Sequence, residues 1–268
     1  MTGGLPEQVV AVDWSGARDG GGRHIWLARV DVASEALVEL CAGRSRDQVC
    51  ARLLEIAADE PRTVIGLDFA FSLPAWFIRE CGFESVAELW AADDRREAWL
   101  SECRAPFWGR PPTWRRPPVA GSVYRRTAED ITERRGVRPK SVFQVGGAGS
   151  VGTGSLRGMR TLRMLREGGV SIWPFDPLRL PAVVEIYPRL FTGRTKTAQH
   201  AARVTHLKQL GWPGSLDLRE RVSSSADAFD AAVSAVSMAR LAASLAGLGP
   251  AVDDRERLEG RIFAPVGS

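Results

Sequence analysis

The chain reads VVAVDWSG over residues 9–16, an apolar run that ends in Asp13. Four consecutive apolar residues are typical of a strand that is buried on both faces of a sheet. A second run, TVIGLD at residues 63–68, has the same form and ends in Asp68. If the two strands are parallel neighbours, both carboxylates emerge at the sheet edge where open α/β sheets bind ligands.

The segments around these two runs predict alternating strands and helices. Turn residues at 18–23 separate the first strand from a returning strand at 24–30, which gives a hairpin. Periodicity predicts helical segments at residues 47–58, 75–104, 155–167, 197–210 and 225–240, and further strands at 37–40, 141–145, 170–175 and 182–187. This alternation is typical of an α/β domain.

Three further acids stand where they could join Asp13 and Asp68. Glu185 ends the apolar part of the strand at residues 182–187, and Asp227 and Asp230 are three residues apart, on one face of the last long helix. Carboxylates that lie close together repel one another unless a cation compensates. Oxygen ligands suit Mg²⁺ or Mn²⁺, so we predict a site for one of these metals. The predicted ligands are Asp13, Asp68, Asp227, Asp230 and Glu185. For Glu185, the alternative is an ion pair with a nearby arginine.

The order of these segments resembles that of the RNase H-like fold. ADAFDAA at residues 226–232 is similar to the C-terminal helix of RuvC-type junction resolvases, in which both acids bind metal. The chain resembles more closely the uncharacterised family of unknown function 429, a family of predicted RNase H-like nucleases. Residues 10–16, 65–74 and 184–188 and the helix that contains Asp227 carry this resemblance, and residues 259–263 echo it more weakly.

The resemblance implies an RNase H-like mixed sheet flanked by helices, in one domain that spans residues 1–268. It also implies a large insertion between the second and third acid-bearing strands, at about residues 81–140, helical at first and then rich in Arg, Pro and Trp. Asp13, Asp68 and Asp230 would be the catalytic acids of a metal-dependent nuclease or phosphodiesterase that hydrolyses nucleic acids. Asp68 departs from the many members of the superfamily that carry Glu there.

The insertion contains PFWGRPPTWRRPP at residues 106–118. Arginine pairs with phosphates and aromatic rings stack on unpaired bases, so this composition favours nucleic-acid binding. The net charge of +4 also fits a polyanionic partner. The alternative is a surface loop that its tryptophans attach to the domain and whose arginines are merely solvated. The predicted nucleic-acid contacts are Arg110, Trp114, Arg115, Arg116, Arg125 and Arg126.

A glycine-rich loop at residues 146–154 supports two competing functions. GAGSVG at residues 147–152 fits G-x-G-x-x-G between a predicted strand and a predicted helix, and Asp176 follows at a distance suited to a ribose contact. This pattern predicts a dinucleotide enzyme or, since glycine loops hold phosphates, a relative that binds ATP or another nucleotide. The arrangement of a P-loop, with its lysine, is absent from the sequence. A third alternative is a nucleic-acid-binding module with a vestigial site.

The composition excludes several other classes. Four cysteines without a C-x-x-C pair and three histidines argue against a structural zinc site. The sequence has no apolar run long enough to span a membrane and no secretion signal at its start. We therefore expect a cytoplasmic protein with reduced thiols and no membrane partner.

Overall fold

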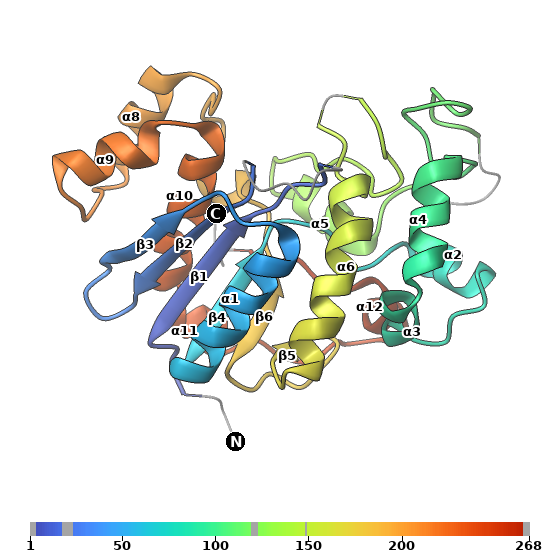
Figure 1. Ribbon diagram of the computed structural model, residues 1–268, viewed down its shortest axis with the longest axis horizontal. Helices are drawn as coiled ribbons and strands as arrows, with labels where there is room; N and C mark the ends of the chain where they lie inside the picture. Colours follow the sequence, from blue (N-terminus) through green and yellow to red (C-terminus); the bar gives the residue numbers. More distant parts are fainter. Residues whose placement is uncertain (1–3, 18–23, 119–122, 148, 265–268) are drawn as a thin grey trace.

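The computed structural model describes residues 4–17, 24–118, 123–147 and 149–264 (Figure 1). The predicted turn at residues 18–23 lies outside these ranges. The described strands form one sheet in the order β3-β2-β1-β4-β6-β5. Strand β2 runs opposite to the other strands, which are all parallel to one another. The strands are β1 (Gln8–Asp13), β2 (Trp26–Asp31), β3 (Leu37–Cys41), β4 (Thr63–Leu67), β5 (Ser171–Ile172) and β6 (Ala182–Glu185).

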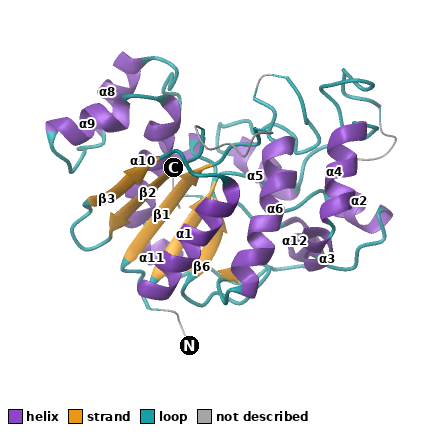
Figure 2. Cartoon of the chain, in the orientation of Figure 1, coloured by secondary structure: helices purple, strands orange, loops and turns teal. Residues whose placement is uncertain are grey.

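Helices flank this sheet, so the protein has an α/β architecture with a mixed sheet (Figure 2). Between β3 and β6 they are α1 (Arg46–Asp59), α2 (Ala75–Glu80), α3 (Val86–Ala91), α4 (Asp93–Glu102), α5 (Thr127–Arg134) and α6 (Gly152–Glu167). After β6 come α7 (Arg189–Thr192), α8 (His200–Gln209), α9 (Leu216–Ser223), α10 (Ala226–Arg240), α11 (Ala242–Ala246) and α12 (Asp254–Glu259). No helix in the described ranges has both the length and the apolar character needed to cross a bilayer.

Both faces of the sheet are covered, which explains why β1 is apolar throughout. Val10 and Val12 belong to a buried cluster with side chains of α1 and α6, whereas Val9 and Ala11 belong to a second cluster with side chains of α10. Figure 1 shows α1 and α6 in front of the sheet and α10 behind it. Alternate residues of a strand point to opposite faces, so a strand covered on both faces needs apolar residues at every position.

The segment predicted as an insertion packs into the core of the domain. Trp90, Leu100 and Phe107 belong to the same buried cluster as Val10 and Ile65 of the central strands. Of the predicted helical segment at residues 75–104, three short helices form, α2, α3 and α4, and α5 lies in the part expected to be irregular. The prediction that residues 105–140 are wholly irregular is therefore wrong at α5.

Two predicted strands differ in the structure. Residues 141–145 form a turn instead of a sheet strand, because the Val145 amide donates to the Trp108 carbonyl (2.8 Å) and the Trp108 amide to the Phe143 carbonyl (3.0 Å). These bonds join the segment to the insertion. Of residues 170–175, only Ser171–Ile172 is a strand, since the Asp176 carboxylate turns the chain back by accepting from the Ile172 amide (3.0 Å).

Candidate functional site

The register of the central strands places Asp13 beside Asp68. Val12 pairs with Leu67 across β1 and β4, and the Asp68 amide donates to the Val12 carbonyl (3.1 Å). Asp13 follows Val12 as the last residue of β1, and Asp68 follows Leu67 directly after the end of β4. Because Val12 and Leu67 face α1 and α6, the alternation of side chains turns both aspartates toward the face that α10 covers.

Helix α10 brings two more carboxylates to this position. It begins after Ser225, whose hydroxyl accepts from the Ala228 amide (3.0 Å), a normal N-cap. Asp227 lies in the first turn, 41% exposed, and its Oδ2 is 4.0 Å from Nδ1 of His24. Asp230 lies nearly one turn further on, and its Oδ1 is buried without a hydrogen-bond partner. An unpaired buried carboxylate oxygen is costly, so it indicates a group that another ligand satisfies.

The pKa values show that the carboxylates interact. Burial and repulsion by Asp68, Asp230 and Asp227 hold the pKa of Asp13 well above its ordinary value. Burial, followed by repulsion from Asp230, raises the pKa of Asp68 to about 8. Asp13 and Asp68 therefore do not ionise independently of each other. Burial raises the pKa of Asp230 to about 7, although Arg189 opposes the shift. Such clustered shifts are typical of functional sites.

Residues that the sequence reading did not include also border the acids. Burial and the nearby Asp68 raise the pKa of Tyr187, and Arg189 is the positive charge that lowers the pKa of Asp230 most. Both residues directly follow β6, whose carboxyl end meets the same sheet edge as β1 and β4. Their position just past the third acid-bearing strand was the sequence signal that could have identified them.

The side chain of Glu185 leaves the sheet on the face opposite to the four aspartates, although at the sheet edge it lines the same pocket as Asp68. Glu185 pairs with Leu67 in the register, one position earlier than Asp68, so its side chain points away from α10. There its carboxylate forms two bonds with Arg126, Nη1 to Oε2 at 2.9 Å and Nη2 to Oε1 at 2.6 Å. It also accepts from the Phe71 amide (3.0 Å). The ion pair considered as the alternative for Glu185 is what the structure contains, and we no longer include Glu185 among the ligands.

Arg126 is correspondingly removed from the predicted nucleic-acid surface. Its side chain is 1% exposed, and its Nε donates to Oε1 of Glu129 at 2.7 Å. The donors of this guanidinium are taken by Glu129, Glu185 and the Glu259 carbonyl, although Arg126 lines the same pocket as Asp68.

The other predicted contacts divide into two groups. Trp114, Arg115 and Arg116 are exposed. Arg110 donates to the Thr153 hydroxyl (3.0 Å), and Arg125 pairs with Asp130 (3.2 Å) and Glu133. The first group is therefore available to a ligand, whereas the second already holds parts of the chain together.

The glycine-rich loop shares a pocket with Asp68. A pocket of about 160 Å³ is lined by Asp68, Trp14 and Tyr187 together with Ser150, Val151 and Gly154. This placement fits a loop that contacts a ligand of the acid site. It argues against dinucleotide binding, because the preceding strand is missing and Asp176 is engaged by Arg166 (2.6 Å). Ala148, within the motif, is outside the described residues.

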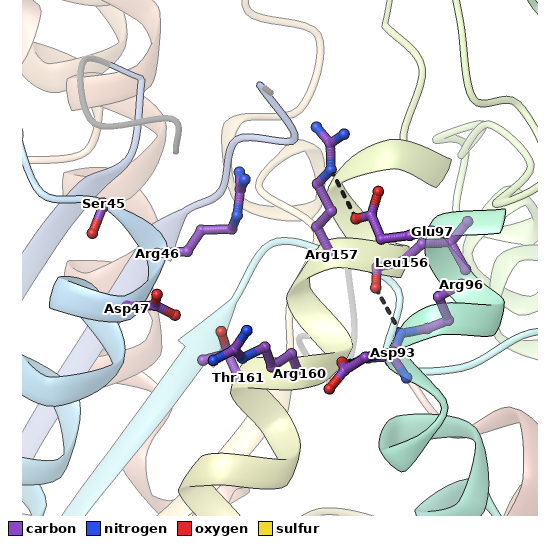
Figure 3. Close-up of a pocket in the computed structure, with 10 residues that line it drawn as sticks. All are labelled: Ser45, Arg46, Asp47, Asp93, Arg96, Glu97, Leu156, Arg157, Arg160 and Thr161. Carbon is purple, nitrogen blue, oxygen red and sulfur yellow. Dashed lines mark hydrogen bonds and ion pairs between the residues drawn. The ribbon is translucent and has the colours of Figure 1, made fainter. Parts of the chain in front are cut away.

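Two arginines fix the backbone that follows Asp13 (Figure 3). Arg46 donates from Nη1 to the carbonyls of Ser15 (3.0 Å) and Ala17 (2.9 Å), and Arg157 donates from Nη1 to the carbonyl of Gly16 (2.7 Å). Both line a pocket of about 380 Å³ with side chains of α1, α4 and α6. The carbonyls of Ser15, Gly16 and Ala17 therefore each accept from an arginine that α1 or α6 supplies.

The donor set of the acids fits a hard divalent cation. Their ligating atoms are all carboxylate oxygens, and the buried Oδ1 of Asp230 has no other partner. Within the described ranges, no three His, Cys, Asp or Glu side chains are gathered tightly enough to hold a metal as they stand. Mutual repulsion opposes a closer approach of the uncompensated carboxylates, and because their pKa values are raised, a cation would have to displace protons from them.

Comparisons with family models, with curated proteins and with solved structures gave no match for this chain.

Proposed function

We propose that the protein is a metal-dependent nuclease or phosphodiesterase with an RNase H-like fold. The observation that carries this proposal is the convergence of Asp13, Asp68, Asp227 and Asp230, in which burial and neighbouring aspartates raise the pKa values of Asp13 and Asp68. The sheet order and the single antiparallel strand β2 support the fold assignment, because hairpin, helix and acid-bearing strands follow in the order on which the resemblance rests.

Asp13, Asp68 and Asp230 would hold Mg²⁺ or Mn²⁺, and Asp227, more exposed, would assist. A bound ion of this kind activates water and offsets the charge that develops on a phosphodiester. The protein would contribute by holding the carboxylates close together and by leaving Oδ1 of Asp230 without another hydrogen-bond partner. Arg189 and Tyr187 border the same site, where a cation and a phenol can contact the phosphate oxygens of a substrate.

The test is to replace Asp13 with Asn and to measure cleavage of single- and double-stranded DNA and RNA with Mn²⁺ or Mg²⁺. We expect Asp13→Asn, Asp68→Asn and Asp230→Asn each to lose at least about 99% of the rate, as the loss of one charged ligand implies. The matched control is Asp59→Asn, an exposed carboxylate at the end of α1. Undiminished cleavage by Asp13→Asn would falsify the catalytic assignment.

Two other functions are separated by direct binding measurements. A nucleic-acid-binding module with a vestigial site would bind DNA or RNA but would show no heat of Mn²⁺ binding in calorimetry. A nucleotide-binding relative is favoured by one observation, the position of Ser150, Val151 and Gly154 in the pocket that contains Asp68. Such a relative would be stabilised against heat by ATP with Mg²⁺ and would not cleave nucleic acids.

A further inference from the structure

A second pocket continues from the acid site toward the insertion. It measures about 530 Å³ and borders the pocket of Asp68, because Pro139 and Lys140 line both. The two pockets are therefore adjacent, with Pro139 and Lys140 common to both. We call the two pockets together the acid-to-insertion groove.

The distal half of the acid-to-insertion groove is strongly cationic. Its charged lining consists of Arg116, Arg125, Arg138, Lys140 and a single carboxylate, Asp130. Arg125 pairs with Asp130 and Glu133, and Arg138 with Glu133 (3.0 Å). Arg116 is exposed, and no carboxylate in the described ranges forms an ion pair with it. Among the arginines of this lining, Arg116 is thus the one whose charge is left for a polyanion within the described residues.

An aromatic side chain stands in a fixed position among these cations. The ring of Tyr124 packs edge-to-face on Trp108 (centroids 5.3 Å apart) and on Phe143 (6.2 Å). The Arg116 guanidinium lies 5.2 Å from the centroid of the Tyr124 ring. Tyr124 and Trp108 both line the groove. Aromatic rings and arginine planes held beside a cationic path are how proteins bind unstacked bases.

This combination distinguishes between kinds of nucleic acid. In a duplex the bases stack on one another and present only their edges to a protein. An aromatic ring inside a pocket can be reached only by a base that is unpaired and turned outward. A duplex would be bound by phosphate contacts on a more open surface, without an aromatic ring in a pocket.

We propose that the acid-to-insertion groove binds an unpaired nucleic-acid strand, which makes single-stranded DNA or RNA, or an unpaired flap, the substrate class. The proposal rests on the nuclease function proposed above. The strand places one phosphate at the aspartates, its backbone passes Lys140 and Arg116, and a base lies against the Tyr124 ring. Exposed Trp114 and Arg115, which directly precede Arg116 in the sequence, are available as further contacts.

The experiment measures binding in EDTA, so that neither bound metal nor cleavage of the strand affects the measured affinity. Fluorescence anisotropy follows labelled oligothymidine, oligouridine and a duplex of equal length over a range of salt concentrations. We expect single strands to bind more tightly than the duplex. Arg116→Ala should reduce the slope of log affinity against log salt by about 0.7, the value for one lost contact to a single strand. Tyr124→Leu should weaken single-strand binding at least about fivefold without changing the slope.

Two controls keep the result interpretable. Tyr124→Phe retains the ring and should bind as the wild type does, so a loss of affinity in Tyr124→Leu alone identifies stacking. Arg257→Ala removes a 61% exposed arginine of α12 that does not line the groove, and it should leave both slope and affinity nearly unchanged. Equal binding of duplex and single strand, or groove variants that bind as Arg257→Ala does, overturns the proposal. Failure of the nuclease function shows instead as strand binding without cleavage.

Discussion

The backbone of Gly16 lies directly against that of Gly154. A Cβ atom added to Gly16 would be 2.4 Å from the Gly154 amide nitrogen, closer than side chains ever approach a backbone. Gly16 follows Asp13 by three residues, and Gly154 belongs to the first turn of α6. The loop that leaves the acid site and the end of the glycine-rich loop are therefore packed as one unit, and only glycine fits between them.

Gly16→Ala should consequently shift the loop that follows Asp13, although Gly16 itself has no side chain in the acid site. The added methyl group meets backbone atoms that cannot rotate away, so the loop after Asp13 has to shift. We expect a destabilisation of about 1–3 kcal/mol, the usual effect of overpacking, and a clear loss of Mn²⁺ affinity. Urea denaturation and calorimetric titration measure the two effects. Gly249→Ala, where no atom lies within 4 Å of the added Cβ, should change neither.

Asp230→Asn should stabilise the protein in the absence of metal and abolish its response to metal. At pH 8.5 the Asp230 carboxylate, with a pKa of about 7, is ionised and unpaired at Oδ1, whereas Asn carries no charge. We expect a higher Tm in EDTA, by about 2–4 °C for each kcal/mol of relieved repulsion. Added Mn²⁺ should raise the Tm of the wild type and of Asp59→Asn, but not that of Asp230→Asn. A variant less stable than the wild type in EDTA would contradict the assigned repulsion.

The stability of the metal-free protein should fall as the pH rises from about 4 to 8. The folded-state pKa values of about 8 for Asp68 and about 7 for Asp230 lie above those of an unfolded chain, near 3.9. Between these values the folded state binds more protons than the unfolded state, so each pH step lowers the free energy of unfolding. Urea denaturation in EDTA at several pH values tests this trend. Stability that stays level or increases from pH 6 to 8 would refute it.

Metal affinity should show the opposite trend. Because Mn²⁺ has to displace the protons of Asp68 and Asp230, its affinity should rise between about pH 6 and 8 and then level off. Proton release is measured by calorimetry in two buffers of different ionisation enthalpy. The variant Asp230→Asn should release fewer protons on any residual binding.

Arg126→Gln should be much more destabilising than Glu185→Gln. Removal of Arg126 leaves Glu185 and Glu129 buried without a countercharge, a change of the kind that costs about 3–5 kcal/mol. Removal of the Glu185 charge leaves Arg126 with Glu129, so the remaining pair is still neutral. Arg125→Gln, in a partly exposed ion pair, serves as control and should cost at most about 1 kcal/mol. Urea denaturation compares the three variants, and the reverse order for the first two would contradict the assigned pairing.

The central strands and the four aspartates could be predicted from the sequence, because both depend on local patterns. The apolar runs before Asp13 and Asp68 specify buried strands, and the spacing of Asp227 and Asp230 specifies one helix face. The parallel register of β1 and β4 places Asp13 and Asp68 at the same level of the sheet, and side-chain alternation turns both toward the face that carries Asp227 and Asp230.

The position of Glu185 could not be read from its own segment. Its strand looks like the other two, but its register with β4 places Glu185 opposite Leu67, one residue before the level of Asp68. A shift of the pairing register by one residue moves each side chain of a strand to the opposite face of the sheet. The local sequence around Glu185 does not determine this register. The same holds for residues 141–145, which join Trp108 of the insertion through contacts distant in the sequence.

The bond between Arg126 and Glu185 also determines how far this chain can be shortened. In the described ranges, the insertion supplies the one ion-pair partner of Glu185, Arg126. The Phe71 amide adds a hydrogen bond but no charge. Excision of residues 81–140 to obtain a minimal catalytic core would leave that carboxyl group buried without its countercharge. An engineer would have to change Glu185 in the same step. The insertion and the third acid-bearing strand thus form an inseparable pair, which can be modified together but not one at a time.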